Sequence, residues 1–160
     1  MNLMMTMVVE GEQGVDDCVV PNWRCILVHK QRTSARTRFL CVGRDVVFPE
    51  APDDACGLSD PDEPTTQSGS VLAHPASGLP ALADQLGLSP GALQVEGPPL
   101  GRLLDEEGTP PVWLVEVVTT DPPFDAASSM GGRFISIMEA RHVPVVQRDL
   151  LRRAYERVLG

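Results

Sequence analysis

The sequence predicts an α+β protein of one domain, with a mainly antiparallel sheet and helices packed on one face. Strand-like runs come early in the chain, in a hairpin over about 23–48. A further strand over about 112–120 lies between helices near 79–88 and 144–159. Strands that come first and then mix with helices, without a regular βαβ alternation, are typical of this class. A length of 160 residues suits a single domain over 1–160.

The hairpin is predicted from two apolar runs, 23–29 and 38–48, separated by the polar loop 30–37. β-branched and aromatic residues of this kind are typical of strands. Both faces of the hairpin are apolar, which indicates that both are covered. We expect one face to hold Cys25, Leu27, Phe39 and Cys41, and the other to hold Ile26, Val28, Leu40 and Val42. Gly43 inside the second run suggests a bulge or a close backbone approach.

The segment 49–80 has a different composition, because prolines, acidic residues, serines and glycines dominate it. Few of its residues can contribute to a core, so we expect an acidic, Pro-rich mobile loop. An edge strand over 70–74 is conceivable within it. A loop of this length is unusual in a compact domain.

The last third of the chain predicts a strand, a second short strand and a helix. Asp121-Pro122-Pro123 ends the strand over 112–120, and the run 133–138 alternates as a strand does. The final helix carries an apolar stripe through Val146, Leu150, Ala154 and Val158, widened by Leu151 and Tyr155. A stripe this wide suits a core, and it also suits the interface of a dimer.

Charge limits the partners that the chain can have. The formal net charge is -9, so a global basic footprint for nucleic acid is absent. The basic residues gather in 24–44 and 133–157, on either side of an acidic middle. This pattern favours self-complementary packing or a partner with an anionic group, although a solvated surface without a partner explains it as well.

The four cysteines, Cys18, Cys25, Cys41 and Cys56, form no C-x-x-C pair. No metal site and no cofactor are therefore expected. The N-terminus lacks the positive region of a secretory signal, so the simplest location is a reducing cytoplasm with free thiols. No apolar run approaches the roughly 20 residues that span a bilayer.

A first candidate site follows the strand over 112–120. The run Thr119-Thr120-Asp121-Pro122-Pro123-Phe124 resembles the D-P-P-Y/F signature of amino-group methyltransferases. The resemblance implies that Asp121 accepts a hydrogen bond from a target amine and that Phe124 stacks on the target ring. The glycine-rich loop that would hold S-adenosylmethionine in that family does not precede the motif. A strand terminator explains the same residues.

Downstream of this motif, small residues and one cation could form an anion-binding nest, which would join Asp121 and Phe124 in one ligand site. Its residues are Ser128, Ser129, Gly131, Gly132 and Arg133. A plain glycine turn is the alternative interpretation.

A second candidate is the run 79–94, which looks like the core of a helix-turn-helix motif, with Gly87 in the turn. In that motif the second helix reads the major groove of DNA. Here Gly97-Pro98-Pro99 would cut the second helix short, and Gln94 is its only plausible base reader. Two short packed helices explain the run as well.

A third candidate is the tip of the hairpin, where cations alternate with hydroxyl groups. The residues that could contact an anion or a partner are Lys30, Arg32, Arg36 and Arg38. A solvated tip that blocks edge pairing is the alternative. A catalytic pair of Cys41 and His29 is also conceivable, since both could lie near one end of the hairpin.

Taken together, the sequence favours a non-catalytic cytoplasmic binding or accessory protein that contacts a protein partner or a small anionic ligand. We expect a homo-oligomer, with a dimer favoured. We expect neither a nucleic acid nor a membrane as a partner. The alternatives are a small enzyme with its site over Asp121–Arg133, or a DNA-binding protein that uses 79–94.

Overall fold

The computed structural model describes residues 22–31, 33–34, 36–60, 75, 78–104 and 108–160. The strands are β2 (Arg24–Gln31), β3 (Arg36–Val42), β4 (Gly57–Ser59), β5 (Leu93–Val95), β6 (Gly101–Leu104), β7 (Pro111–Val117) and β8 (Gly132–Ile135). The α-helices are α1 (Leu79–Gln85), α2 (Phe124–Ser129) and α3 (Val145–Leu159), and the 3-10 helices are η3 (Pro90–Ala92) and η4 (Ile137–His142). The α+β class is confirmed.

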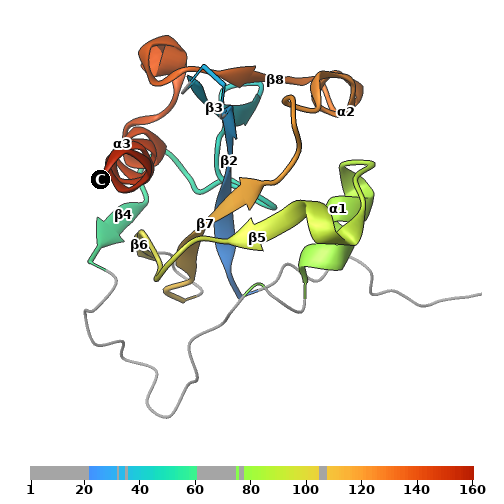
Figure 1. Ribbon diagram of the computed structural model, residues 1–160. Coiled ribbons are helices and arrows are strands. Elements are labelled where there is room, and N and C mark those ends of the chain that lie inside the picture. Colours follow the sequence, from blue (N-terminus) through green and yellow to red (C-terminus); the bar gives the residue numbers. More distant parts are fainter. Residues whose placement is uncertain (1–21, 32, 35, 61–74, 76–77, 105–107) are drawn as a thin grey trace, which may run out of the picture.

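These strands form one mixed sheet in the order β4-β6-β7-β2-β3-β8, with β5 also paired to β7 (Figure 1). Among the ladders of the described strands, only β2 with β7 is parallel. β2 and β7 are buried along most of their length, as strands covered on both faces are. They form the centre of the molecule.

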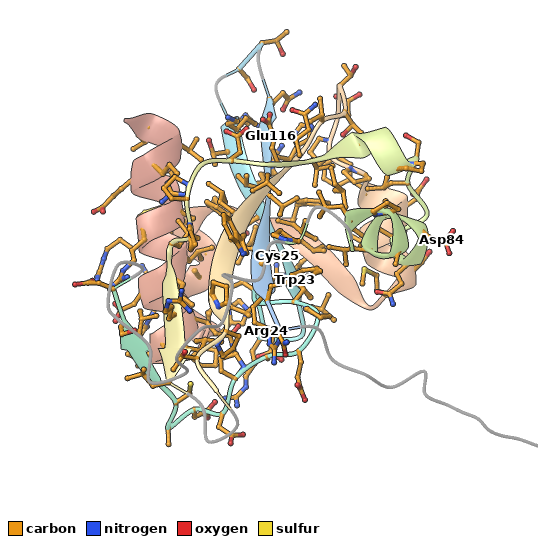
Figure 2. The ribbon with its side chains drawn as sticks, turned by 90° about the horizontal axis from the view of Figure 1, so that it is seen from below. Trp23, Arg24, Cys25, Asp84 and Glu116 are labelled. Atoms are coloured by element: carbon orange, nitrogen blue, oxygen red, sulfur yellow. The ribbon has the colours of Figure 1, made fainter. Side chains whose placement is uncertain are left out.

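Helices cover both faces of the sheet, so the prediction that they pack on one face is wrong. α3 lies on one side, and α1 and α2 lie on the other (Figure 1). Figure 2 shows Cys25 of β2 between α3 and α1. Leu150 and Ile26 belong to the cluster on the α3 side, and Leu82 and Leu27 to the cluster on the α1 side. The physical reason is that the central strands are apolar on both faces and each face needs a cover.

The hairpin forms, but its faces differ from those expected. Val28 lies opposite Phe39 in the ladder between β2 and β3. Directly opposed residues project to the same face, so Phe39 and Cys41 share the α3 side with Ile26 and Val28. Leu40 joins the other face, beside the side chains of α1. The grouping expected from the sequence was therefore wrong.

The second strand of the hairpin ends at Val42, six residues earlier than expected. Gly43, with a φ of 64°, stands in a tight turn rather than in a bulge. Val42 and Asp45 exchange two backbone hydrogen bonds of 2.9 and 3.0 Å across that turn. The chain then runs back beside β2, where Phe48 and Cys25 are bonded in both directions.

Buried Gln147 of α3 fastens this returning segment. Its side-chain Oε1 accepts hydrogen bonds from the backbone N–H groups of Val46 and Val47, at 2.8 and 3.2 Å. Its Nε2 donates to Asp45 at 2.9 Å. One polar side chain thus satisfies two buried amide groups that no strand partner reaches.

The expected loop 49–80 contains a strand, since β4 pairs with β6, and α1 begins before the loop ends. The strand considered at 70–74 lies outside the described residues. Within 79–94 no second α-helix forms after α1: η3 leads directly into β5, which pairs with β7. The pairing at this edge of β7 has overridden the helical pattern, so the helix-turn-helix arrangement over 79–94 is not formed.

Of the other late elements, α3 forms where expected, and the two strands end early. β7 ends at Val117, three residues before the predicted strand does. β8 ends at Ile135, three residues before the predicted strand does, because the chain turns into η4. Val146, Leu150 and Ala154 are buried, and so is Leu151. The apolar stripe of α3 is therefore used within the fold, which removes one reason for expecting a dimer.

Candidate binding site at the open edge of strand β3

The candidate site arises where β8 leaves β3. The two strands pair from Val42 opposite Gly132 to Phe39 opposite Ile135. After Ile135 the chain turns away into η4. Among the residues that the structure describes, no strand lies beside Arg36–Arg38 on the side of β8. We call this part of β3 the open edge.

The cause of the departure is a helix start. The backbone N–H of Ser136 donates a hydrogen bond of 2.8 Å to Oε1 of Glu139, and the Ser136 side chain caps η4 in return. This reciprocal capping box stabilises the first turn of a helix. It commits residues to η4 that would otherwise have extended β8.

The main chain of Thr37 points to the open edge. Cys25 uses both its N–H and its C=O on Phe48, which lies on the β3 side of β2. Backbone groups alternate in direction along a strand, so His29 directs its N–H and C=O toward β3, where it lies opposite Arg38. Thr37, one residue before Arg38, therefore directs its N–H and C=O away from β2.

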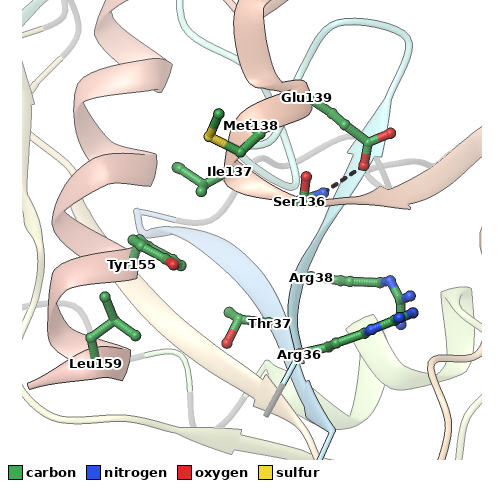
Figure 3. Close-up of a pocket in the computed structure, with 9 residues that line it drawn as sticks. All are labelled: Arg36, Thr37, Arg38, Ser136, Ile137, Met138, Glu139, Tyr155 and Leu159. Atoms are coloured by element: carbon green, nitrogen blue, oxygen red, sulfur yellow. Dashed lines mark hydrogen bonds between the residues drawn. The ribbon is translucent and has the colours of Figure 1, made fainter. Parts of the chain in front are cut away.

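A cavity of about 420 Å³ lies along this edge (Figure 3). It is lined by Arg36, Thr37, Arg38, Ser136, Ile137, Met138, Glu139, Tyr155 and Leu159. We call it the edge cavity. Its volume falls within the range of small-ligand sites in proteins, about 300–1,000 Å³.

The strand divides the edge cavity into two sides. Thr37 points to the side of Tyr155 and Leu159, whereas Arg36 and Arg38 point to the opposite side (Figure 3). The first side is apolar and open to solvent: Met138 is 75% exposed and Leu159 is 67% exposed. The second side is cationic. Alternation of side chains along β3 produces this division.

Arg38 links the edge cavity to the candidate site after β7. Its guanidinium lies 6.0 Å from the centre of the Phe124 ring, and Phe124 meets Phe134 edge to face at 6.3 Å. Its Nη1 also reaches the side chain of Gln31 at 3.5 Å. A cation held over an aromatic face keeps its outer N–H groups available for an anion.

Glu139 is the carboxylate on the cationic side. The hydrogen bond from the Ser136 backbone, together with the positive charges of Arg133 and Arg38, lowers the pKa of the Glu139 carboxyl. It therefore stays ionised near neutral pH and offsets part of the positive charge.

The cationic residues predicted at the hairpin tip lie at different places in the structure. Arg36 and Arg38 line the edge cavity. Lys30 lies elsewhere and forms ion pairs with Glu96 at 3.3 Å and Glu116 at 3.5 Å. Arg32 lies outside the described residues. Only part of the predicted cationic group thus comes together at one site.

The residues predicted around the D-P-P-F motif make separate local contacts instead of forming one site. Asp121 is exposed, and its backbone C=O accepts a hydrogen bond from the Thr119 hydroxyl. Ser129 donates to the backbone of Asp125, which belongs to its own helix. Ser128 is exposed on the same helix. These contacts are those of a strand end followed by a short helix.

The two glycines of that region follow α2. Gly131 lies in the turn that ends the helix, and Gly132 begins β8. A Cβ atom at Gly132 would lie 2.7 Å from the backbone oxygen of Cys41, so this close strand pairing requires glycine. Arg133 is exposed and acts electrostatically on Cys41 and Glu139.

The structure does not form the cysteine–histidine pair considered from the sequence. Cys41 Sγ lies 3.6 Å from Nε2 of His142, whereas His29 is buried on the opposite face with its Nε2 2.8 Å from the Thr119 oxygen. The expectation failed because cross-strand geometry puts Cys41 and His29 on different faces. Burial raises the pKa of the Cys41 thiol more than Arg133 lowers it. The thiol is therefore poorly suited to act as a nucleophile.

Sequence reasoning missed most of the apolar side of the edge cavity. Met138, Tyr155 and Leu159 come from two elements, and no local pattern connects them with Thr37. A signal did exist for Ser136 and Glu139, whose spacing is that of a capping box. It predicts where a helix starts and hence where β8 must stop.

A comparison of the chain with models of known protein families and with curated protein sequences finds no match. Across the described ranges, no three side chains of His, Cys, Asp or Glu converge as a metal site would require. Within the same ranges, no helix is both long enough and apolar enough to cross a bilayer.

Proposed function

We propose that this chain is a non-catalytic binding protein of the cytoplasm, which uses Arg36 and Arg38 to contact an anionic group of a protein partner or a small ligand. One observation carries the proposal: both arginines line a cavity whose other side is exposed and apolar. Charge recognition combined with an apolar contact is the usual composition of a binding site. The net charge of -9 makes this local positive surface distinctive.

The chemistry of the edge cavity supports binding rather than catalysis. Its lining supplies guanidinium groups, hydroxyl groups and apolar surface. The carboxylate of Glu139 is held ionised by Ser136, so it is a poor proton donor near neutral pH. General acid–base work requires a group with a pKa near the working pH.

The cysteines support the proposed location. Cys25 and Cys41 are buried without a disulfide. Proteins that keep their thiols reduced are typical of reducing compartments.

The test is a titration of isotopically labelled protein, followed by NMR, with N-acetyl-aspartate and with inorganic phosphate as separate probes. We expect millimolar additions to shift the backbone signals of Arg36–Arg38 and Ser136–Glu139 first. The variant R36E/R38E should lose these shifts. The matched control R44E/R148E changes the same number of charges, one beyond the far end of β3 and one in the first turn of α3, at residues that do not line the edge cavity, and it should keep the shifts.

The proposal would be wrong if neither anion perturbed those signals, or if both variants responded as the unaltered protein does. A response confined to Asp121–Arg133 would instead favour the alternative site after β7.

A further inference from the structure

Resting on the proposed function, we propose a specific occupant for the edge cavity: an extended segment of a partner protein that adds to β3 as a strand. The segment pairs with the open edge through its main chain. Its acidic side chains contact Arg36 and Arg38, and its alternate apolar side chains contact Tyr155 and Leu159.

The backbone of Thr37 provides the attachment. Its N–H and C=O point outward, at the place where the next hydrogen-bonded pair of the β3–β8 ladder would stand. The register pairs Phe39 with Ile135, so a continued β8 would set Ile137 opposite Thr37. Ile137 belongs to η4 instead. A strand from another protein can take this position, since strand addition is a common mode of peptide recognition.

The two sides of the edge cavity fit a strand of alternating character. Successive side chains of a strand point to opposite faces, with a period of two residues. One set would meet the exposed apolar groups of Met138 and Leu159 on the α3 side. The other set would meet Arg36 and Arg38 on the α2 side. The recognised pattern is therefore acidic, apolar, acidic, apolar.

Charge complementarity selects a partner over a second copy of this chain. Two open edges set side by side would bring Arg36 and Arg38 of one copy against the same residues of the other. Like charges on paired strands are destabilising, and cations on an edge oppose self-association. An acidic segment is attracted to the open edge instead, since carboxylates form strong, charge-assisted hydrogen bonds with guanidinium groups.

The length of the open edge limits the recognised segment. Arg36–Arg38 spans about 10 Å at the usual rise per residue of a strand. A segment of about four to six residues covers the edge and its flanks. An interface of this size is typical of weak and reversible contacts.

The experiment uses the full chain and three blocked peptides of equal length and composition, each carrying a fluorophore on a glycine spacer. The first alternates Glu and Val. The second has the same residues in two blocks, all Glu and then all Val. The third alternates as the first does, with N-methyl groups on its backbone amides. Fluorescence polarisation gives the affinity of each, and NMR shows which backbone signals move.

We expect the alternating peptide to bind about tenfold more tightly than the block peptide and the N-methylated peptide, and to shift the amide of Thr37. R36E/R38E should weaken it by about tenfold or more, and R44E/R148E should leave it unchanged. Replacing Glu by Lys in the peptide should remove binding. The preference for the alternating peptide over the block and N-methylated peptides supports strand addition, and the dependence on charge supports the contact with Arg36 and Arg38.

Three outcomes would overturn the inference. Equal binding of the alternating and N-methylated peptides would exclude pairing through the backbone. Shifts by N-acetyl-aspartate, without tighter binding of the alternating peptide, would leave the proposed anion site standing and remove the strand. Dimers that form with protein concentration and move the Thr37 signal would identify a second copy as the occupant.

Discussion

Glu139 is the residue whose ionisation bears most directly on the site. Its folded-state pKa lies below the ordinary value of 4.5, chiefly because the Ser136 backbone N–H donates to it. A group with a depressed folded pKa stabilises the fold above its unfolded pKa, and this contribution disappears as the pH falls through the folded pKa. Its carboxylate also competes with an incoming acid for Arg38.

We therefore predict two effects of E139Q. The variant should melt slightly below the unaltered protein at neutral pH and at the same temperature once the pH is below the folded pKa of Glu139. It should also bind the acidic alternating peptide more tightly, because a negative charge is removed from the cationic side. Melting curves recorded at several pH values measure the stability, and polarisation titrations measure the affinity for the peptide. A lower affinity of E139Q would show that Glu139 helps the ligand.

A second prediction at the residue scale concerns the reactivity of the cysteine thiols. Burial raises the pKa of the Cys25 thiol from 9.0 to about 12, and only the thiolate reacts with alkylating reagents. Cys25 should therefore resist labelling in the native protein and be labelled only on unfolding. Mass spectrometry of the labelled peptides separates the sites. Rapid native labelling of Cys25 would contradict the packing of β2 between α1 and α3.

At the scale of elements, the hairpin, β7 and α3 could be predicted from local patterns, because strand and helix periodicities are visible within a few residues. The run 79–94 shows the limit of such reasoning. Its residues suit a second helix as well as a strand, and the edge of β7 decided between them by offering backbone hydrogen bonds to Leu93–Val95. The sequence likewise predicts a bulge or a close backbone approach at Gly43 instead of the observed turn, because Val46–Phe48 continues the apolar pattern after the strand has ended.

The prediction at the scale of elements concerns the stability of Gln147 variants, because Gln147 connects α3 to the segment that returns after β3. Q147M keeps the volume but leaves the amides of Val46 and Val47 unpaired, each at a cost of about 1–3 kcal/mol. We expect a loss of about 2–4 kcal/mol in the free energy of unfolding, measured by urea denaturation. The control D45A removes a partner of Gln147 and keeps both amide bonds, so its loss should be smaller. Equal stability of Q147M and the unaltered protein would rule out this anchoring role.

At the scale of the whole molecule, the sheet separates two cores. The α3 side and the α1 side form distinct clusters of buried residues, with Ile135 in the first and Leu82 in the second. Mutations in groups that share no partners have additive effects on stability. The arrangement of the helices can therefore be tested by energetics alone.

The prediction is that L82A and I135V act independently. L82A should cost about 2–5 kcal/mol and I135V about 0.5–1.5 kcal/mol. Their double variant should match the sum within about 0.5 kcal/mol. F39L combined with I135V is the contrasting pair, since these residues are opposed in the ladder and should deviate from additivity. A strong coupling between Leu82 and Ile135 would contradict the two separate cores.

The sequence by itself determined the α+β class, the apolar hairpin, the stripe of α3 and the cationic residues Arg36 and Arg38. These depend on neighbours within a turn or a strand. The tertiary structure alone decided which face each helix covers, the parallel pairing of β2 with β7, and the open edge. Tyr155 and Leu159 line one cavity with Thr37 only because β8 stops at a capping box and α3 packs on that face of the sheet. Contacts between such distant segments depend on how whole elements pack, and no periodicity within one element encodes them.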